Sequence, residues 1–154
     1  MQVRNPNYKE DISELFSAAA FVSNTGIRLI DCGPGWVLSE LSITEEHGQQ
    51  DGAVHAGVQA TMADHTAGAA ATTLAEAGQR VLSIEFKINL LRMARGSALR
   101  CKAEVLKAGR TVSVVEASVF LDTGDGGFEV LVSKAVVTLA LVDAAKAGGG
   151  HKAT

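Results

Sequence analysis

Cysteine and proline are scarce in this sequence, with two residues of each among 154. Cys32 and Cys101 stand in no CxxC pattern, and two thiols allow at most one internal bridge, so the chain is not a disulfide scaffold. A chain of about 150 residues buries roughly 68–70% of its unfolded surface, so it needs no disulfide or structural metal to fold. We expect both thiols to lie buried and unreactive in strands.

An excess of positive charge is also lacking. The 14 Lys and Arg residues stand against 17 Asp and Glu residues, which gives a formal net charge of −3. Proteins that bind mainly nucleic acid need a basic surface, so we expect no nucleic-acid partner. No stretch approaches about 18 uninterrupted apolar residues, and the N-terminus MQVRNPNYKEDISELF has no apolar signal core. We therefore expect no membrane partner and a cytoplasmic location.

The apolar residues that are present, 47% of the chain, suit a single domain, which we place at 1–143. The run 144–154, AAKAGGGHKAT, predicts a flexible C-terminal tail with a solvated His151. At about 9–21, acidic residues in the first turn and apolar residues at helical spacing predict an amphipathic helix. Apolar runs on both sides of a Gly-Pro-Gly turn at 33–35 predict a β-hairpin.

Alanine dominates the stretch from His55 to about Ala77, which predicts a long helix that ends at Gly78. A helix so rich in Ala and Gly is thin, so a sheet can approach it on several sides. We therefore expect it to be the buried central helix. The polar run 45–54 before it predicts a loop.

After Gly78 the apolar period changes from 3.6 to 2, which is typical of strands. The four runs lie at 81–91, 97–108, 111–122 and 128–142. Short connections between them favour antiparallel neighbours, hence a four-strand meander. Helices on one face of a mostly antiparallel sheet make an α+β fold.

Asp64 stands near the middle of the helix that we expect to be buried. An ionised carboxylate is seldom buried without a partner. Either it faces solvent or bonds a nearby backbone or hydroxyl group, or it projects into a cleft as a base or nucleophile. The residues alone leave both readings open.

The start of the same helix, His55-Ala56-Gly57, carries backbone N–H groups without internal partners. With the helix dipole they favour negative charge, so the oxyanion formed from an ester or thioester carbonyl would be stabilised there. The small residues Ala56 and Gly57 let a substrate approach the backbone, whereas His55 alone is as well explained by capping or packing.

The spacing of these two features has a geometric consequence. Ala56 and Asp64 are eight residues apart, about 12 Å along a helix axis, so one carbonyl cannot reach both. If both act on one substrate, Asp64 comes from a second copy of the chain, in a symmetric dimer with two shared sites.

Other catalytic patterns are absent: the sequence has no GxSxG, no GxxxxGK[ST] and no GxGxxG that opens a helix after a strand. The spacing of His47, His55 and His65, with Asp51 and Asp64 between them, fits neither HExxH nor a zinc finger. We therefore expect no metal site and no cofactor.

Three stretches, VHAGVQATMADHTAGAAA, VLSIEFKINLLRMARG and AEVLKAGRTVSVVEASVF, together resemble the hotdog-fold acyl-CoA thioesterases of the phenylacetate-pathway (PaaI-like) kind, over roughly residues 26–142. That family carries His-Gly-Gly at the start of the central helix, an Asp about nine residues after the His, a strand similar to xSxxFxINFLRPAxxG and a later Gly-Arg turn. The resemblance implies a long helix wrapped by a curved antiparallel sheet. It also implies a homodimer or homotetramer with active sites at the dimer interface.

The resemblance further implies roles for single residues. Asp64 would be the catalytic carboxylate, and the Ala56 N–H would polarise the thioester carbonyl. His55 would hold that turn in place, and Gln49 matches a family Asn or Gln that orients water or the thioester. Ser83 matches a Ser or Thr that some members use beside the carboxylate.

The sequence departs from the family at several positions. Ala56 stands where Gly is usual and Met93 where Pro is usual. Gln50 offers the same amide as Gln49, so either could take that role. Ser83 falls on the polar face of its strand, so we expect it to need the dimer partner rather than the helix behind it.

The resulting expectation is an acyl-CoA thioesterase for a small aromatic or medium-chain acyl group, with Asp64 as base or nucleophile. Arg92, Arg95 and Arg110 are candidates to face the CoA diphosphate, although each is at least as well explained as a solvated surface charge. Two alternatives stay open: a non-catalytic acyl-CoA-binding hotdog module, and an enoyl-thioester hydratase.

Overall fold

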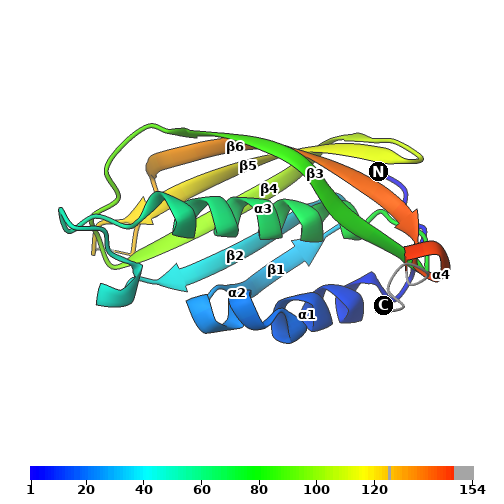
Figure 1. Cartoon of the computed structure of the whole chain (residues 1–154), viewed down its shortest axis with the longest axis horizontal. Helices are drawn as coiled ribbons and strands as arrows, with labels where there is room; N and C mark the ends of the chain where they lie inside the picture. Colours follow the sequence, from blue (N-terminus) through cyan, green and yellow to red (C-terminus); the bar gives the residue numbers. More distant parts are fainter. Residues whose placement is uncertain (125, 148–154) are drawn as a thin grey trace, which may run out of the picture.

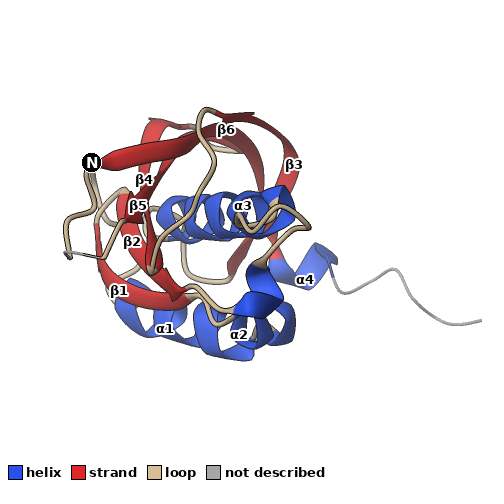
Figure 2. Ribbon diagram, turned by 90° about the vertical axis from the view of Figure 1, so that its left-hand side faces the viewer, coloured by secondary structure: helices blue, strands red, loops and turns tan. Residues whose placement is uncertain are grey.

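The strands form one six-stranded antiparallel sheet in the order β1-β2-β4-β5-β6-β3. A computed structural model describes residues 1–124 and 126–147. The strands are β1 (Arg28–Gly33), β2 (Trp36–Ser42), β3 (Gln79–Leu90), β4 (Ala98–Ala108), β5 (Val112–Asp122) and β6 (Val130–Asp143). The sheet curves around helix α3 (Ala56–Thr72), while α1 (Tyr8–Ala18) and α2 (Ala20–Thr25) lie on the open side of the curve (Figures 1 and 2).

Helix α3 is buried along much of its length because small side chains let the sheet approach it. Met62, Ala63 and Ala67 are completely buried. The helix contacts β2, β3, β4, β5 and β6. Thr66 Oγ1 of the helix and Ser39 Oγ of β2 are hydrogen-bonded to each other at 2.7 Å. The expected α+β arrangement with a buried central helix is therefore confirmed.

The central helix ends at Thr72, earlier than the expected Ala77. After it, the N–H groups of Leu74 and Ala75 bond to carbonyls three residues back, which tightens the last turn. The Thr73 hydroxyl donates to the Ala70 carbonyl and accepts from the Gly35 N–H, so it competes with continued helix and anchors the β1–β2 hairpin.

The expected meander is wrong for one pair of strands. Strand β3 pairs with β6 at one edge of the sheet, whereas β4 lies between β2 and β5. The connection 91–97 crosses between them, and other segments hold it: the Leu91 N–H donates to the Val132 carbonyl, and the Val54 N–H donates to the Ala94 carbonyl. A short connection alone does not show that two strands pair.

Strand β3 contains a β-bulge that overturns the expected facing of Ser83. The register shifts between Ser83 and Glu85, so Ser83 opposes the buried Leu139 of β6 and Phe86 opposes the buried Val137. Because one extra residue reverses the alternation, Ser83 and Phe86 both face α3. Leu82, which opposes Ala140, lies on the other face and is half exposed.

The N-terminal segment forms two helices where one was expected at 9–21. Ala19 is extended, with φ −77° and ψ 91°, and separates α1 from α2. The Ser23 hydroxyl donates to the carbonyls of Phe16 and Ser17, which have no helical partner at the end of α1. The hydroxyl thereby stabilises the break.

The hairpin expected around residues 33–35 is present. Gly33 of β1 pairs with Trp36 of β2. Gly35 between them has a φ of 83°, a conformation that side-chain-bearing residues rarely adopt.

At the other terminus the short helix α4 (Ala144–Ala147) begins the segment that we expected to be a flexible tail. The rest of that segment, with His151, lies outside the described residues. Between β2 and α3, a single 3₁₀ turn at Glu45–His47 interrupts the expected loop. Over the described ranges, no helix has the length and apolar character needed to span a bilayer.

Both cysteines are free and buried, in β1 and β4, as expected. Burial raises the pKa of the Cys32 thiol, and full burial raises that of Cys101 to about 12. Both thiols therefore stay protonated near neutral pH, as inert side chains do.

Candidate active site

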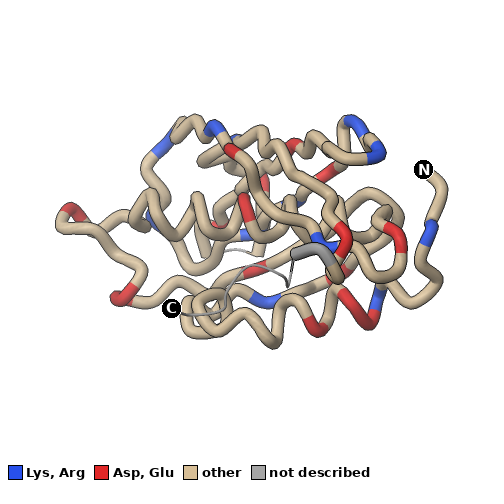
Figure 3. The backbone as a smooth tube through the Cα atoms, turned by 45° about the vertical axis from the view of Figure 1, so that its right-hand side comes forward, with Lys and Arg blue, Asp and Glu red and all other residues tan. Residues whose placement is uncertain are grey.

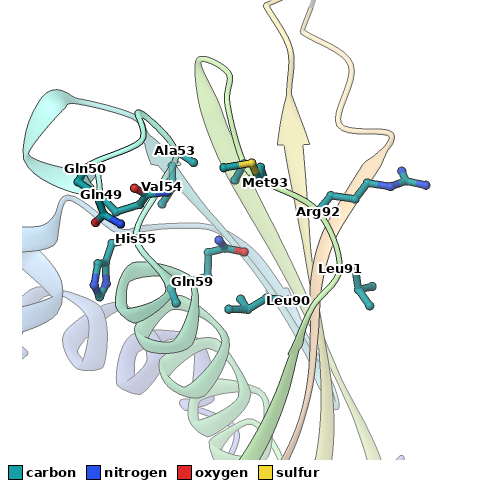
Figure 4. Close-up of a pocket in the computed structure, with 12 residues that line it drawn as sticks. Gln49, Gln50, Ala53, Val54, His55, Gln59, Leu90, Leu91, Arg92 and Met93 are labelled. Atoms are coloured by element: carbon teal, nitrogen blue, oxygen red, sulfur yellow. The ribbon is translucent and has the colours of Figure 1, made fainter.

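A cavity of about 530 Å³ opens at the N-terminal end of α3 (Figure 4). The loop before the helix supplies one wall, and the connection after β3 supplies the opposite wall. Its lining residues are Gln49, Gln50, Ala53, Val54, His55, Ala56, Gln59, Leu90, Leu91, Arg92, Met93 and Ala94. Five of the candidate residues from the sequence thus meet in one place: both glutamines, His55, Ala56 and Arg92.

The first backbone amide of α3 is available for a ligand. Ala56 is exposed, and its N–H has no hydrogen-bond partner among the described residues. His55 is the N-cap residue, and its Nδ1 accepts the Gly57 N–H at 2.9 Å. The imidazole thus satisfies the second amide of the helix and leaves the first one unpaired at the rim of the cavity.

Gly57, which was expected to help bind the substrate, does not line the same cavity as Ala56. Its N–H is already bound to His55, and it lines a neighbouring cavity with Phe21 and Thr61 rather than the cavity of Ala56. A Cβ atom at Gly57 would lie 3.0 Å from His55 Nδ1, so glycine here lets the imidazole approach the backbone.

Gln49 and Gln50 both line the cavity, so the structure leaves open which of them acts. Gln49 Oε1 accepts the Asp51 N–H, while its Nε2 has no partner among the described residues. Gln50 Nε2 donates to Asp51 Oδ2 at 3.2 Å. Of the two glutamines, Gln49 is thus the one with an unpaired donor group, its Nε2.

Asp64 lies in a second, smaller cavity of about 250 Å³, which Phe21, Val22, His65 and Phe86 help to line. The Ser83 hydroxyl of the same chain donates to Asp64 Oδ1 at 2.7 Å. The expectation that Ser83 needs a second subunit is therefore wrong, because the bulge in β3 turns this hydroxyl toward α3. Asp64 and Ala56 open into separate cavities of one subunit, as their spacing along the helix requires.

The remaining histidines of the motif have structural surroundings. His47 Nδ1 accepts the Thr44 N–H at 3.0 Å, and its Nε2 lies 2.8 Å from the Thr25 carbonyl, so His47 ties the loop to α2. His65 packs edge-on against Phe16, with ring centroids 4.6 Å apart, and burial lowers its pKa. Over residues 1–124 and 126–147, no cluster of three or more His, Cys, Asp or Glu residues could hold a metal ion.

The arginines proposed to face a diphosphate are spread over the molecule. Arg92 lines the cavity of Ala56, and Arg95 donates to the Asp51 carbonyl at 2.8 Å on the same side. Arg110 lies in the β4–β5 turn, next to Thr111, whose carbonyl accepts the Leu141 N–H near the opposite end of the sheet. Figure 3 shows basic and acidic residues interspersed over the backbone.

Sequence reasoning missed one residue of the cavity, Gln59. It is only 3% exposed, and its Oε1 has no hydrogen-bond partner within the described part of the chain. The available signal was its spacing: it follows His55 by four residues, so both lie on the same face of the helix.

Residues 51–127 match the family model described as the Thioesterase superfamily. Acyl-coenzyme A thioesterase 13 of Homo sapiens is 31% identical over 107 residues, which cover 68% of this chain and 76% of that protein. A 1,4-dihydroxy-2-naphthoyl-CoA hydrolase of Listeria monocytogenes is 26% identical over 98 residues, which cover 64% of this chain and 80% of that protein.

Among solved structures, a thioesterase family protein from Silicibacter pomeroyi superposes with a TM-score of 0.84 at 32% sequence identity. The superposition covers 88% of this chain and 98% of that one. The hotdog arrangement expected from the sequence is therefore confirmed.

Proposed function

Because the chain belongs to the thioesterase superfamily, we propose that it hydrolyses the thioester of an acyl-CoA with a small aromatic or medium-chain acyl group. Family membership confirms the enzyme class expected from the sequence, a thioester hydrolase. The CoA ester and the PaaI-like kind are the finer proposal. It rests on one observation above all: the unpaired Ala56 N–H at the rim of the large cavity.

The Ala56 amide would act on the thioester carbonyl. An N–H at the first position of a helix points along the positive end of the dipole and has no competing acceptor. As water or a carboxylate adds to the carbonyl carbon, the oxygen gains negative charge, and this donor would stabilise it. One such donor contributes roughly 10²–10³ in turnover.

The Asp64 carboxylate would drive the addition. Ser83 binds Oδ1, while Oδ2 has no partner among the described residues and is left for water or the acyl carbon. As base, Asp64 takes a proton from water while the hydroxyl adds to the carbonyl carbon, and the C–S bond then breaks to release the thiolate. As nucleophile, it would add to the acyl carbon and displace the thiolate, which leaves a mixed anhydride that water hydrolyses in a second step. Ser83 positions the carboxylate in both cases.

The proposed site is shared between two subunits. Ala56 of one subunit would face Asp64 of the partner subunit, since the two groups of one chain open into separate cavities. Strand β3 supports this assembly, because it is an edge strand with half-exposed apolar residues, among them Leu82, Ile84 and Leu90. We therefore propose a homodimer, which a homotetramer could contain as its unit.

The other predicted residues would have supporting roles. His55 would keep the Ala56 amide oriented by binding the next N–H, and Gly57 would give the imidazole its space. Gln49 Nε2 would donate to the thioester or to the attacking water, with Gln50 beside it. Arg92 stands at the same cavity, where it would meet a CoA phosphate.

The test is thiol release from a panel of acyl-CoAs, followed with a chromogenic thiol reagent. We expect release with wild type and a loss of roughly 10²–10⁴-fold in Asp64→Asn, with the dimer intact by gel filtration. Glu85→Gln is the matched control: it removes a nearby carboxylate that instead binds the Thr138 hydroxyl, and it should retain activity.

Two outcomes would replace this proposal. Tight acyl-CoA binding with no thiol release from any substrate would indicate a binding module. Hydration of an enoyl-CoA without free thiol would indicate a hydratase. Wild-type turnover in Asp64→Asn would end the assignment of this carboxylate.

A further inference from the structure

The amide oxygen of Gln59 is a buried polar group without a partner among the described residues. The side chain is only 3% exposed, and its Oε1 forms no hydrogen bond with a described residue. Leaving such a group unpaired in the interior is unfavourable, so native proteins rarely do so without a reason. Its neighbours along α3 are small or apolar, so an apolar residue would suit this position. Such a residue would also avoid the free-energy cost of the unpaired polar group.

The position of this amide is informative. Gln59 projects from α3 toward the middle of the residues that line the large cavity (Figure 4). Val54, Leu90 and Leu91 supply apolar walls around it. A cavity with apolar walls and a few polar groups of fixed position is typical of a site that orients a ligand through hydrogen bonds.

The amide lies within reach of a group bound at Ala56. Three residues separate Ala56 from Gln59, about 4.5 Å along the helix axis and nearly one full turn, so both are on the same side of the helix. An acyl group whose carbonyl is held at Ala56 can therefore extend past Gln59.

We infer that Gln59 is a specificity-determining residue that selects acyl groups carrying a hydroxyl a few bonds from the thioester carbonyl. A hydroxyl both donates and accepts, so it can pair with the amide in either orientation of its oxygen and nitrogen. This inference rests on the proposed function, because it assumes that the cavity receives the acyl group of the substrate.

The test compares two aryl acyl-CoAs of the same skeleton, one with a ring hydroxyl and one without, in wild type and in Gln59→Met. Wild type should prefer the hydroxylated substrate by about tenfold or more in kcat/KM, since a buried hydrogen-bonding site discriminates against analogues that lack the group. Gln59→Met keeps the length of the side chain and removes the amide. This variant should lose the preference because kcat/KM falls for the hydroxylated substrate, while kcat/KM for the other substrate stays the same or rises.

Ser133→Ala is the matched control. Ser133 Oγ is also completely buried and has no partner in the described part of the chain, and it opposes Leu90 in the sheet, but it does not line the cavity. This variant should keep the wild-type preference. If Ser133→Ala removes the preference as Gln59→Met does, general packing rather than the cavity amide is responsible, and the inference fails.

Binding of non-hydrolysable thioether analogues of the two substrates, measured by calorimetry, separates this inference from the proposed function. Absence of hydrolysis together with a Gln59-dependent binding preference would overturn the proposed function alone. Hydrolysis of both substrates with equal kcat/KM in wild type, or a preference that persists in Gln59→Met, would overturn the inference alone. In that case a bound water satisfies the amide.

Discussion

The two ends of helix α3 treat their polar groups in opposite ways. At the C-terminal end the Thr73 hydroxyl, completely buried, donates to Ala70 and accepts from Gly35. At the N-terminal end the Ala56 N–H and the Gln59 Oε1 have no partner among the described residues, although they lie beside a large cavity.

The difference indicates what each end is for. Pairing a buried polar group stabilises the fold, whereas an unpaired one lowers stability unless a ligand satisfies it. The C-terminal end should therefore govern folding with little effect on turnover. The N-terminal end should govern turnover with little effect on folding, or with an effect of the opposite sign.

Of the changes at the two ends of α3, the largest effect is expected at Ala56. Ala56→Pro removes the N–H, and proline is well tolerated at the first position of a helix. The preceding residue also permits it, since His55 has φ −59° and ψ 141°, the extended region that a residue before proline prefers. We expect kcat to fall by roughly 10²–10³ with unchanged thermal unfolding. Ala56→Gly keeps the N–H and should retain activity.

Complementation tests whether the two halves of the site belong to different subunits. Co-expressed Ala56→Pro and Asp64→Asn chains form mixed dimers with one intact and one doubly defective site. Random pairing would restore about a quarter of wild-type activity, since half of the dimers are mixed and each has one working site. No recovery, with mixed dimers shown by two affinity tags, would place both groups in one subunit.

At Thr73 we expect substitution to lower stability and to leave turnover unchanged. Thr73→Val keeps the shape but leaves the Gly35 N–H without its acceptor, so the free energy of unfolding should fall by about 2 kcal/mol, with kcat unchanged. Thr73→Ser keeps the hydroxyl and should lose about 1 kcal/mol or less. Urea denaturation and thiol release measure the two quantities. A tenfold loss of kcat in Thr73→Val would break the contrast between the two ends.

The sequence predicted most of the fold because its signals are local. Alternation located the strands, and the Ala-rich run located the central helix. The pairing of β3 with β6 was missed, since it depends on contacts such as that of Leu91 with Val132, which the spacing of apolar residues does not encode. The helix end at Thr72 was missed because Thr73 finds a distant partner in Gly35.

For the candidate site, chemistry and spacing in the sequence pointed to Ala56 and Asp64, whereas the two glutamines and the role of His55 came from the family resemblance. Ser83 was found as a residue but assigned to the wrong face, since a bulge leaves no mark in the alternation of LSIEF. Gln59 was missed because only the folded chain shows that a polar side chain there has no partner.

Cys101, in the sheet beneath the middle of α3, is another buried group that has a hydrogen-bond partner. Its pKa is raised by burial from an ordinary value of 9.0 to about 12, opposed by a hydrogen bond to Thr66. Above pH 9 the unfolded thiol ionises while the folded one keeps its proton, so the folded state binds more protons and stability falls with rising pH. The contribution is complete below pH 9 and is lost as the pH rises toward 12.

Denaturation of wild type and Cys101→Ala between pH 8 and pH 10.5 would measure this contribution. Above pH 9, wild type should lose up to about 1.4 kcal/mol more per pH unit than the variant. Every other ionisable group is the same in both proteins, so the difference isolates the thiol. Parallel curves would show that the Cys101 thiol ionises in the folded state.

The smallest expected effect is at Gln59, where substitution should raise the free energy of unfolding instead of lowering it. Gln59→Met replaces an amide whose buried oxygen has no partner among the described residues with an apolar side chain of equal length, so the free energy of unfolding should rise by about 1 kcal/mol without ligand. Ser133→Ala should also be neutral or slightly stabilising, because its hydroxyl is equally unpaired. Chemical denaturation of the ligand-free proteins measures both. If Gln59→Met is instead destabilised by 1 kcal/mol or more (about a fivefold change in the folding equilibrium), the amide already has a partner, and the two ends of α3 do not differ in kind.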